Sequence, residues 1–317
     1  MQAKSQRAYI YEVATRDGFQ NESVYVATED KVALVNLLSQ SGLSKIEVTS
    51  FTSPRAIPAL RDAEAVMHQI DRNPSIIYTV LVPNVRGAER ALSCAVDEVN
   101  LVMSVSETHN RTNLRMEREA SLAQLREVVD VVKQTSIAIN VSLSTAFGCP
   151  MEGDIDEDEV LRWAGKFAEL GVSGLTICDT TGMAYPAQVT RLLARLVGHF
   201  PRLEITAHFH NTRGMALANV LAALDAGVDR FDASLGGLGG CPYAPGATGN
   251  VCTEDLVHML ELNGVKTGVD LSRLLDASRR LPELIGHDVP SQVLKAGRRL
   301  DLHSVPQGIG EAQSFAR

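Results

Sequence analysis

The stretch GLTICDTTGMAYPAQVTRLLARLVGHFPRLEITAHFH, residues 174–210, decides the fold. Its two ends, 174–178 and 203–209, are short β-rich runs, and residues 187–198 between them have the spacing of an amphipathic helix. Two short strands joined by a helix predict parallel neighbours, because parallel strands need a long crossover connection. The stretch is therefore a strand–helix–strand unit of an α/β fold.

The same alternation extends outward in both directions. The predicted strands are Ala8–Val13, Lys45–Ser50, Ser75–Val82, Glu98–Val105, Ser136–Leu143, Gly174–Cys178, Leu203–Phe209 and Val228–Ser234. The predicted helices include Lys31–Ser39, Arg55–Ile70, Leu114–Val132, Asp156–Glu169, Ala187–Gly198, Met215–Ala226, Leu271–Leu284 and Val289–Leu300. Eight strands are the number that closes a (β/α)₈ TIM barrel. The alternative is an open doubly wound sheet, but the first strand–helix turn carries no Gly-x-Gly-x-x-Gly motif.

We therefore predict an α/β chain with a TIM-barrel catalytic domain over residues 1–285. A short C-terminal helical extension and tail would follow over residues 286–317, with a frayed end beyond residue 301.

Composition excludes several classes of protein. The 317 residues are 45% hydrophobic and 21% charged, with a net charge of -8, which argues against a dedicated nucleic-acid protein. No apolar run reaches the ~18–20 residues of a membrane span. The five cysteines form no Cys-x-x-Cys pair, and the N-terminus enters a strand by Ala8, leaving no room for a leader peptide. We expect a reducing, cytoplasmic location.

Polar residues gather where the predicted strands end, which is the catalytic face of a TIM barrel. His208 and His210 are two residues apart on a strand, so both imidazoles point to the same side. Asp17 follows strand 1, the neighbour of strand 8 in a closed barrel. One carboxylate and two imidazoles suit a divalent ion with open positions for substrate. Histidines satisfied within the protein and a non-haem iron triad are the alternatives.

Arg16, Glu47 and Asp179 also lie at strand ends. They predict an ion-pair network, which could also aim the guanidinium at a developing oxyanion. The loop 236–250 is rich in glycine and carries Cys241 near its centre. This loop is either a flexible connector or a lid that closes over the site and carries a reactive cysteine.

Together these segments resemble the 3-hydroxy-3-methylglutaryl-CoA lyases, a family of metal-dependent TIM barrels. The resemblance runs from about residue 13 to residue 269. It rests on the motifs RDGFQNE (16–22), IEVTSFTSP (46–54), GCP (148–150), CDTTG (178–182), HFH (208–210), ALAN (216–219), GLGGCPYA (237–244), GN (249–250) and TEDL (253–256).

The resemblance implies the activity, the cofactor and the site residues. The reaction would be a retro-Claisen cleavage of 3-hydroxy-3-methylglutaryl-CoA to acetyl-CoA and acetoacetate. One Mg²⁺ or Mn²⁺ ion would be held by Asp17, His208, His210 and Asn250, with no nucleotide cofactor beyond the substrate's CoA. Catalytic residues would be Arg16 (at the thioester oxygen), Cys241 (as proton donor), Glu47, Asp179 and His208. Substrate contacts would be Gln20, Arg16, Ser50 and Ser144. The implied partner is a small acyl-CoA, in a homodimer or higher homo-oligomer, without nucleic acid or membrane.

Some positions depart from the family pattern. Ser142 stands where many members have tyrosine, and Ser23, Met151, Asn211, Arg213 and Met215 also differ. A smaller residue at 142 opens space, so a larger or differently shaped 3-hydroxyacyl-CoA is one alternative. Asn211 directly follows the histidine pair, as an asparagine does in the acetyl-CoA-dependent 2-oxo-acid synthases. A condensing synthase of that kind is a second alternative. A metal-stabilised binding barrel without activity is the third.

Overall fold

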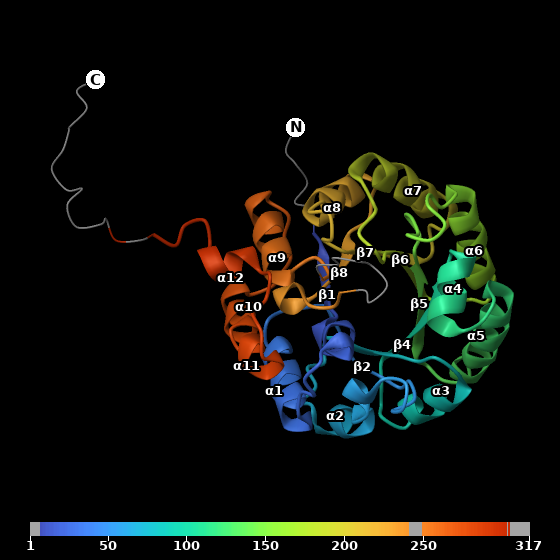
Figure 1. Ribbon diagram of the computed structural model, residues 1–317, viewed down its shortest axis with the longest axis horizontal. Coiled ribbons are helices and arrows are strands. Elements are labelled where there is room, and N and C mark those ends of the chain that lie inside the picture. The colour runs from blue at the N-terminus through green and yellow to red at the C-terminus, as the bar shows by residue number, and fades with distance from the viewer. Residues whose placement is uncertain (1–6, 241–248, 303, 305–317) are drawn as a thin grey trace.

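The computed structural model describes residues 7–240, 249–302 and 304. Its centre is a closed barrel of eight parallel strands in the order β1 to β8, with β8 paired to β1 (Figure 1). The strands are β1 Tyr9–Glu12, β2 Lys45–Ser50, β3 Ile77–Leu81, β4 Glu98–Ser104, β5 Ala138–Ser144, β6 Gly174–Asp179, β7 Glu204–Phe209 and β8 Arg230–Ala233. The predicted TIM barrel is confirmed.

Helices form the outer ring of the barrel in Figure 1. They are α1 Thr28–Leu38, α2 Ala63–Gln69, α3 Val85–Leu92, α4 Glu107–Leu114, α5 Arg118–Val132, α6 Glu157–Glu169, α7 Pro186–His199, α8 Ala216–Asp225 and α9 Thr253–Leu262. Three short helices, α10 Leu271–Ser278, α11 Leu281–Ile285 and α12 Gln292–Ala296, follow. They lie together beside α1 and α9, as Figure 1 shows. The boundary at residue 285 stays a prediction.

Four predicted helices are wrong in their extent. The range 289–300 contains only the short helix α12, Gln292–Ala296. Instead of a helix over 55–70, a single 3₁₀ turn, Pro58–Leu60, precedes α2, because Pro58 forces Ile57 out of the helical region (φ −127°, ψ 81°). The range 114–132 is divided because Arg115 adopts a left-handed conformation (φ 58°) that ends α4. The range 271–284 is likewise two helices, with Pro282 in the first turn of α11.

Apolar side chains fill the space between the strands and the ring of helices, with Trp163, Phe167 and Phe231 among the fully buried ones. Burial of this apolar surface supplies the main stabilisation of the fold. None of the described helices is long and apolar enough to cross a bilayer.

The barrel interior is polar at its amino-terminal end. The ammonium group of Lys45 lies 2.8 Å from both carboxylate oxygens of Glu98, and the hydroxyl of Tyr11 donates to Glu204 at 2.7 Å. Arg230 pairs with the same Glu204 at 3.0 Å. The charges at this end therefore neutralise one another.

Candidate active site

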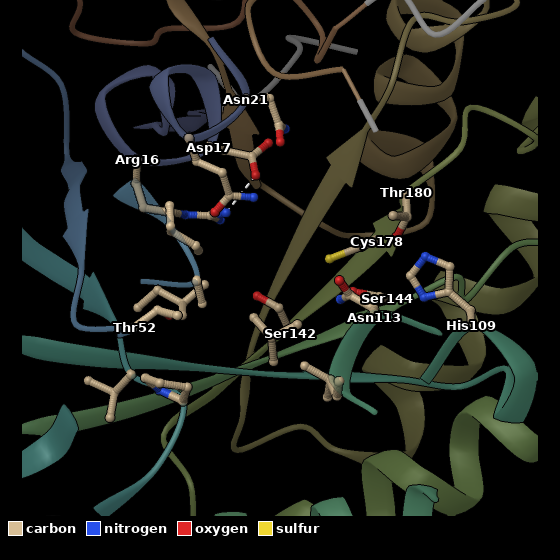
Figure 2. Close-up of a pocket in the computed structure, with 18 of the residues that line it drawn as sticks. Arg16, Asp17, Asn21, Thr52, His109, Asn113, Ser142, Ser144, Cys178 and Thr180 are labelled. Atoms are coloured by element: carbon tan, nitrogen blue, oxygen red, sulfur yellow. Dashed lines mark hydrogen bonds and ion pairs between the residues drawn. The ribbon is translucent and has the colours of Figure 1, made fainter. Parts of the chain in front are cut away.

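A cavity of about 990 Å³ opens at the carboxyl ends of the strands. Arg16 and Asp17 lie on one side of it, and Ser142, Cys178 and Thr180 lie across from them (Figure 2). This is the face on which TIM barrels carry their active sites.

The chain leaves β1 in a single π-helical turn, Ala14–Gly18, that presents Arg16 and Asp17 to the cavity. The Val13 carbonyl accepts hydrogen bonds from the amides of Asp17 (2.7 Å) and Gly18 (3.4 Å), which is the widened ladder of a π-turn. The carboxylate of Glu12 accepts from the amide of Ala14 at 2.9 Å, so the start of the turn is anchored from the strand. Such turns occur frequently at functional sites.

Two carboxylates hold the buried guanidinium of Arg16. Its Nε donates to Glu47 Oε2 at 2.6 Å, its Nη2 lies 2.6 Å from the same oxygen, and its Nη1 donates to Asp17 Oδ1 at 2.5 Å. Burial lowers the pKa of Arg16, but Glu47 and Asp17 outweigh it and the net pKa is raised, so the group stays charged. These contacts use three of the five N–H groups of an arginine, leaving one on Nη1 and one on Nη2 for a ligand.

Asp17, His208 and His210 converge, with one donor atom from each lying within 4.8 Å of the others. Two further atoms in this group are buried without a hydrogen-bond partner in the described part of the chain, Nδ1 of His210 and Oδ1 of Asn250. The amide nitrogen of Asn250 donates to Asp17 Oδ2 at 2.8 Å and to the Leu238 carbonyl at 2.9 Å. Its oxygen is therefore the acceptor left over. Buried acceptors without partners are costly, and a cation among them would satisfy both atoms.

We call Asp17, His208, His210 and Asn250 the ligand group. The backbone of Gly239 packs closely against it. A Cβ atom at this position would lie 2.5 Å from the Asn250 amide nitrogen and 2.9 Å from Asp17 Oδ2, and its φ is +94°. Only glycine fits there, because it has no Cβ and tolerates a positive φ. This part of the glycine-rich loop is thus shaped to approach the carboxylate and the amide.

Charge states in the group suit a divalent cation. Burial raises the pKa of Asp17, but Arg16 and His208 outweigh it and the net pKa is lowered, so the side chain is a carboxylate. Burial, with the neighbouring His208, lowers the pKa of His210 to about 3, so this imidazole is neutral. A carboxylate, a neutral imidazole and an amide oxygen are suitable ligands for such an ion.

Asp232 on β8 fixes the orientation of His208. Its carboxylate lies 3.0 Å from His208 Nδ1, which leaves Nε2 to face the ligand group. Burial lowers the pKa of His208, but Asp232 and Asp17 outweigh it and the net pKa is raised. The sequence reasoning missed Asp232, although an acidic residue inside a strand, in register with His208 on β7, was a visible signal.

The remaining predicted residues divide into three groups. Gln20 and Ser144 line the cavity as expected. Ser50 does not: it is 1% exposed and its hydroxyl donates to Thr52, which does line the cavity. Cys241 lies outside the described residues.

Asp179 has other partners than the expected ion-pair network with Arg16, and its catalytic role stays a prediction. Its Oδ1 accepts from the amides of Met183 (2.7 Å) and Ala184 (3.0 Å), so it fixes the turn after β6 and not Arg16. Burial raises the pKa of Asp179 to about 6. Its contacts hold the neighbouring Cys178 and Thr180 against the cavity.

Asn211, one of the departures from the family pattern, has a structural contact. Its side-chain oxygen accepts from the amide of Ala216 at 3.3 Å, at the start of α8. This contact satisfies one of the free amides of a helix N-terminus.

The chain is similar to known proteins over most of its length. The HMGL-like family model matches residues 7–281. The hydroxymethylglutaryl-CoA lyase of Bacillus subtilis is 48% identical over 286 residues, which cover 90% of this chain and 96% of the relative. An HMG-CoA lyase structure from A. baumannii, in complex with coenzyme A and 3-methylmalate, has a TM-score of 0.92 and 49% identity, covering 96% of this chain and all (100%) of that one. The carboxyl transferase domain of Rhizobium etli pyruvate carboxylase, at 19% identity and a TM-score of 0.70, shares the fold alone.

Proposed function

Because the chain belongs to the HMGL-like family, we propose that it cleaves 3-hydroxy-3-methylglutaryl-CoA to acetyl-CoA and acetoacetate. It is a carbon–carbon lyase, as its relatives at 48% and 49% identity are. One observation carries the proposal: a ligand group with two unpartnered acceptors lies beside an arginine that keeps two N–H groups free for a ligand.

The family depends on a divalent metal, and the ligand group fits one. Asp17, His208, His210 and Asn250 would hold the ion, and the set of oxygen and imidazole ligands favours Mg²⁺ or Mn²⁺. A bound ion would supply Lewis-acid polarisation of the tertiary hydroxyl of the substrate. Asp232 keeps His208 in the tautomer that ligation requires.

Arg16 would stabilise the departing group. Cleavage of the C2–C3 bond places negative charge on the thioester oxygen of acetyl-CoA. Glu47 and Asp17 hold the guanidinium on one edge, so its remaining N–H groups can donate to that oxygen. Since both carboxylates already fix the guanidinium, little reorganisation is needed when the charge develops.

The proton balance needs one base and one acid. The hydroxyl of the substrate loses a proton as the C2–C3 bond breaks, and the acetyl carbon gains one. Following the family resemblance, Cys241 is our proposed proton donor to that carbon. Gln20 and Ser144 line the cavity and would contact the substrate, and Thr52, which also lines the cavity, would do so instead of Ser50.

The condensing synthase receives no support from Asn211, since the contact of this residue with Ala216 is structural. The homo-oligomeric state, the cytoplasmic location and the absence of nucleic-acid and membrane partners stay predictions.

The test is a direct assay of acetyl-CoA release. The purified chain, freed of metal with a chelator, is supplied with 3-hydroxy-3-methylglutaryl-CoA and then with Mg²⁺ or Mn²⁺. We expect acetyl-CoA and acetoacetate in equal amounts, only when the ion is present. Failure to release acetyl-CoA with either ion would overturn the proposal.

A further inference from the structure

Two of the proposed metal ligands come from opposite ends of the chain and lie against each other. Asp17 belongs to the π-helical turn Ala14–Gly18 after β1, and Asn250 ends the glycine-rich loop 236–250. The side-chain amide of Asn250 donates to Asp17 Oδ2 at 2.8 Å. Both side chains can hold one ion only if the segments that carry them keep a fixed spacing. Whatever sets that spacing therefore bears on metal affinity.

Glu12 joins the two segments through a single oxygen atom. Its Oε1 accepts a hydrogen bond from the amide of Ala14 at 2.9 Å, in the turn that carries Asp17. The same Oε1 accepts from the amide of Leu235 at 2.8 Å, directly before the glycine-rich loop. Glu12, Ala14 and Leu235 are all fully buried. One buried atom thus serves as the acceptor for amides of both segments.

Short hydrogen-bonded turns connect these two amides to the ligands. On the first segment, the Val13 carbonyl accepts from the amide of Asp17 at 2.7 Å. On the second, the 3₁₀ turn Leu235–Gly237 leads to Leu238. The Leu238 carbonyl accepts from the side-chain amide of Asn250 at 2.9 Å and from its backbone amide at 3.3 Å. A movement at either amide is therefore passed on to a ligand.

The two segments are also in close contact with each other. A Cβ atom at Gly18 would lie 3.0 Å from Cβ of Leu238, and one at Gly239 would lie 2.9 Å from Asp17 Oδ2. If Oε1 of Glu12 were removed, two buried amides would lose their acceptor, which is costly unless the segments move. Because the contact is close, such a movement would displace Asp17 relative to the other ligands.

We propose that Glu12 is a positioning residue for the metal site, because its Oε1 sets the spacing of the segments that carry Asp17 and Asn250. The inference rests on the ligand group of the proposed lyase and adds a residue outside that group. Residues behind metal ligands commonly change the affinity 10- to 100-fold when they are replaced. The second oxygen, Oε2, lies 2.7 Å from the Thr253 hydroxyl, so the roles of the two oxygens can be tested separately.

The experiment measures Mn²⁺ affinity by titration calorimetry at pH 7, together with the free energy of unfolding, for the full chain and its variants. Glu12→Ala removes the bridging acceptor, and Mn²⁺ affinity should fall at least about tenfold. Glu12→Gln keeps an acceptor oxygen for both amides and an amide group that can donate to Thr253, so it should retain the wild-type affinity. Burial raises the pKa of Glu12 to about 8, so at this pH glutamine replaces a mostly protonated carboxyl group.

Two further variants separate positioning from stability and from charge. Thr253→Val removes the contact with Oε2 and leaves Oε1 in place. It should lower the free energy of unfolding while Mn²⁺ affinity stays at the wild-type value. Glu12→Asp keeps the acid but shortens the side chain by one carbon, so its oxygen no longer bridges the two amides. Its Mn²⁺ affinity should fall as that of Glu12→Ala does.

The outcomes decide the role of Glu12 in each case. Wild-type Mn²⁺ affinity in folded Glu12→Ala, or an equal loss in Thr253→Val, overturns it. If Glu12→Ala does not fold, the affinities of the other two variants decide: a higher value for Glu12→Gln than for Glu12→Asp supports positioning by Oε1, and any other order overturns it.

The titration needs no substrate, so the two proposals can fail separately. A chain that binds Mn²⁺ but releases no acetyl-CoA overturns the lyase activity alone. A wild-type chain that binds no Mn²⁺ overturns the ligand group and the role of Glu12 together.

Discussion

The two ends of the barrel interior are both polar and buried, but they differ in how far their groups are satisfied. At the amino-terminal end, Lys45, Glu98, Glu204 and Arg230 pair with one another, so that Arg230 Nε, which makes no hydrogen bond to the described residues, still lies 3.0 Å from a carboxylate oxygen of Glu204. At the carboxyl-terminal end, buried acceptors of His210 and Asn250 have no partner in the described residues. Buried charges that pair with one another thus indicate a structural role. Buried polar atoms that converge without partners are the sign of a binding site.

The strongest test of this comparison removes the guanidinium at the carboxyl-terminal end. Arg16→Met should lower kcat/KM for 3-hydroxy-3-methylglutaryl-CoA by about three orders of magnitude, because the developing oxyanion loses its donors. Titration with Mn²⁺ should show that the ion still binds, since Arg16 is not among the proposed ligands and only its contact with Asp17 is lost. An Arg16→Met variant of normal activity would refute the oxyanion role.

The matching change at the amino-terminal end should affect stability instead. Lys45→Met leaves Glu98 buried without its partner, and we expect a loss of about 3 kcal/mol in the free energy of unfolding. The folded fraction should cleave substrate at the normal rate. The double variant Lys45→Met with Glu98→Leu, which removes both charges, should recover most of the stability measured by denaturant unfolding. A loss of activity in folded Lys45→Met would show that the two ends are coupled.

Asp232 tests whether the contacts behind the ligand group are functional. Asp232→Asn keeps the shape but removes the charge that supports His208, and Mn²⁺ affinity measured by calorimetry should fall 10- to 100-fold. The matched control is Asp229→Asn on the same segment, whose partner is Arg230 at the other end of the barrel. Equal Mn²⁺ affinity in the two variants would make Asp232 merely structural.

The sequence predicted only part of the carboxyl-terminal site. Asp17, His208 and His210 were found because strand ends are adjacent in a closed barrel and side chains alternate along a strand. The contacts of Asp179 with Met183 and Ala184, and the chain from Glu47 through Asn100 to Ser142, depend on the fold of individual turns and on side-chain orientation. Periodicity carries no information on either. The break at Arg115 was equally invisible, since nothing in the composition signals its positive φ.

The last prediction concerns Glu12, the last residue of β1, whose side chain lies on the opposite side of the strand from Tyr11 and contacts the start of α9. Its carboxylate accepts from the amides of Ala14 (2.9 Å) and Leu235 (2.8 Å) and from the Thr253 hydroxyl (2.7 Å). Burial raises its pKa to about 8, against a usual value of 4.5. The unfolded chain therefore releases this proton at a lower pH than the folded chain does. The stability that Glu12 contributes is complete below its unfolded pKa and is lost as the pH rises toward about 8.

Glu12→Gln isolates this contribution, because the amide has nearly the same shape and does not titrate. We expect the difference in free energy of unfolding between wild type and Glu12→Gln to fall with rising pH, by at most about 1.4 kcal/mol per pH unit between about pH 5 and 8. Glu98→Gln serves as the comparison from the paired end, where Lys45 counteracts the effect of burial on the pKa, so its pH dependence should be weaker. A difference that stays constant with pH would show that the three donors keep Glu12 ionised in the folded chain. Glu12 would then be a buried charge satisfied by its hydrogen bonds, as the charges of the amino-terminal end are satisfied by their ion pairs.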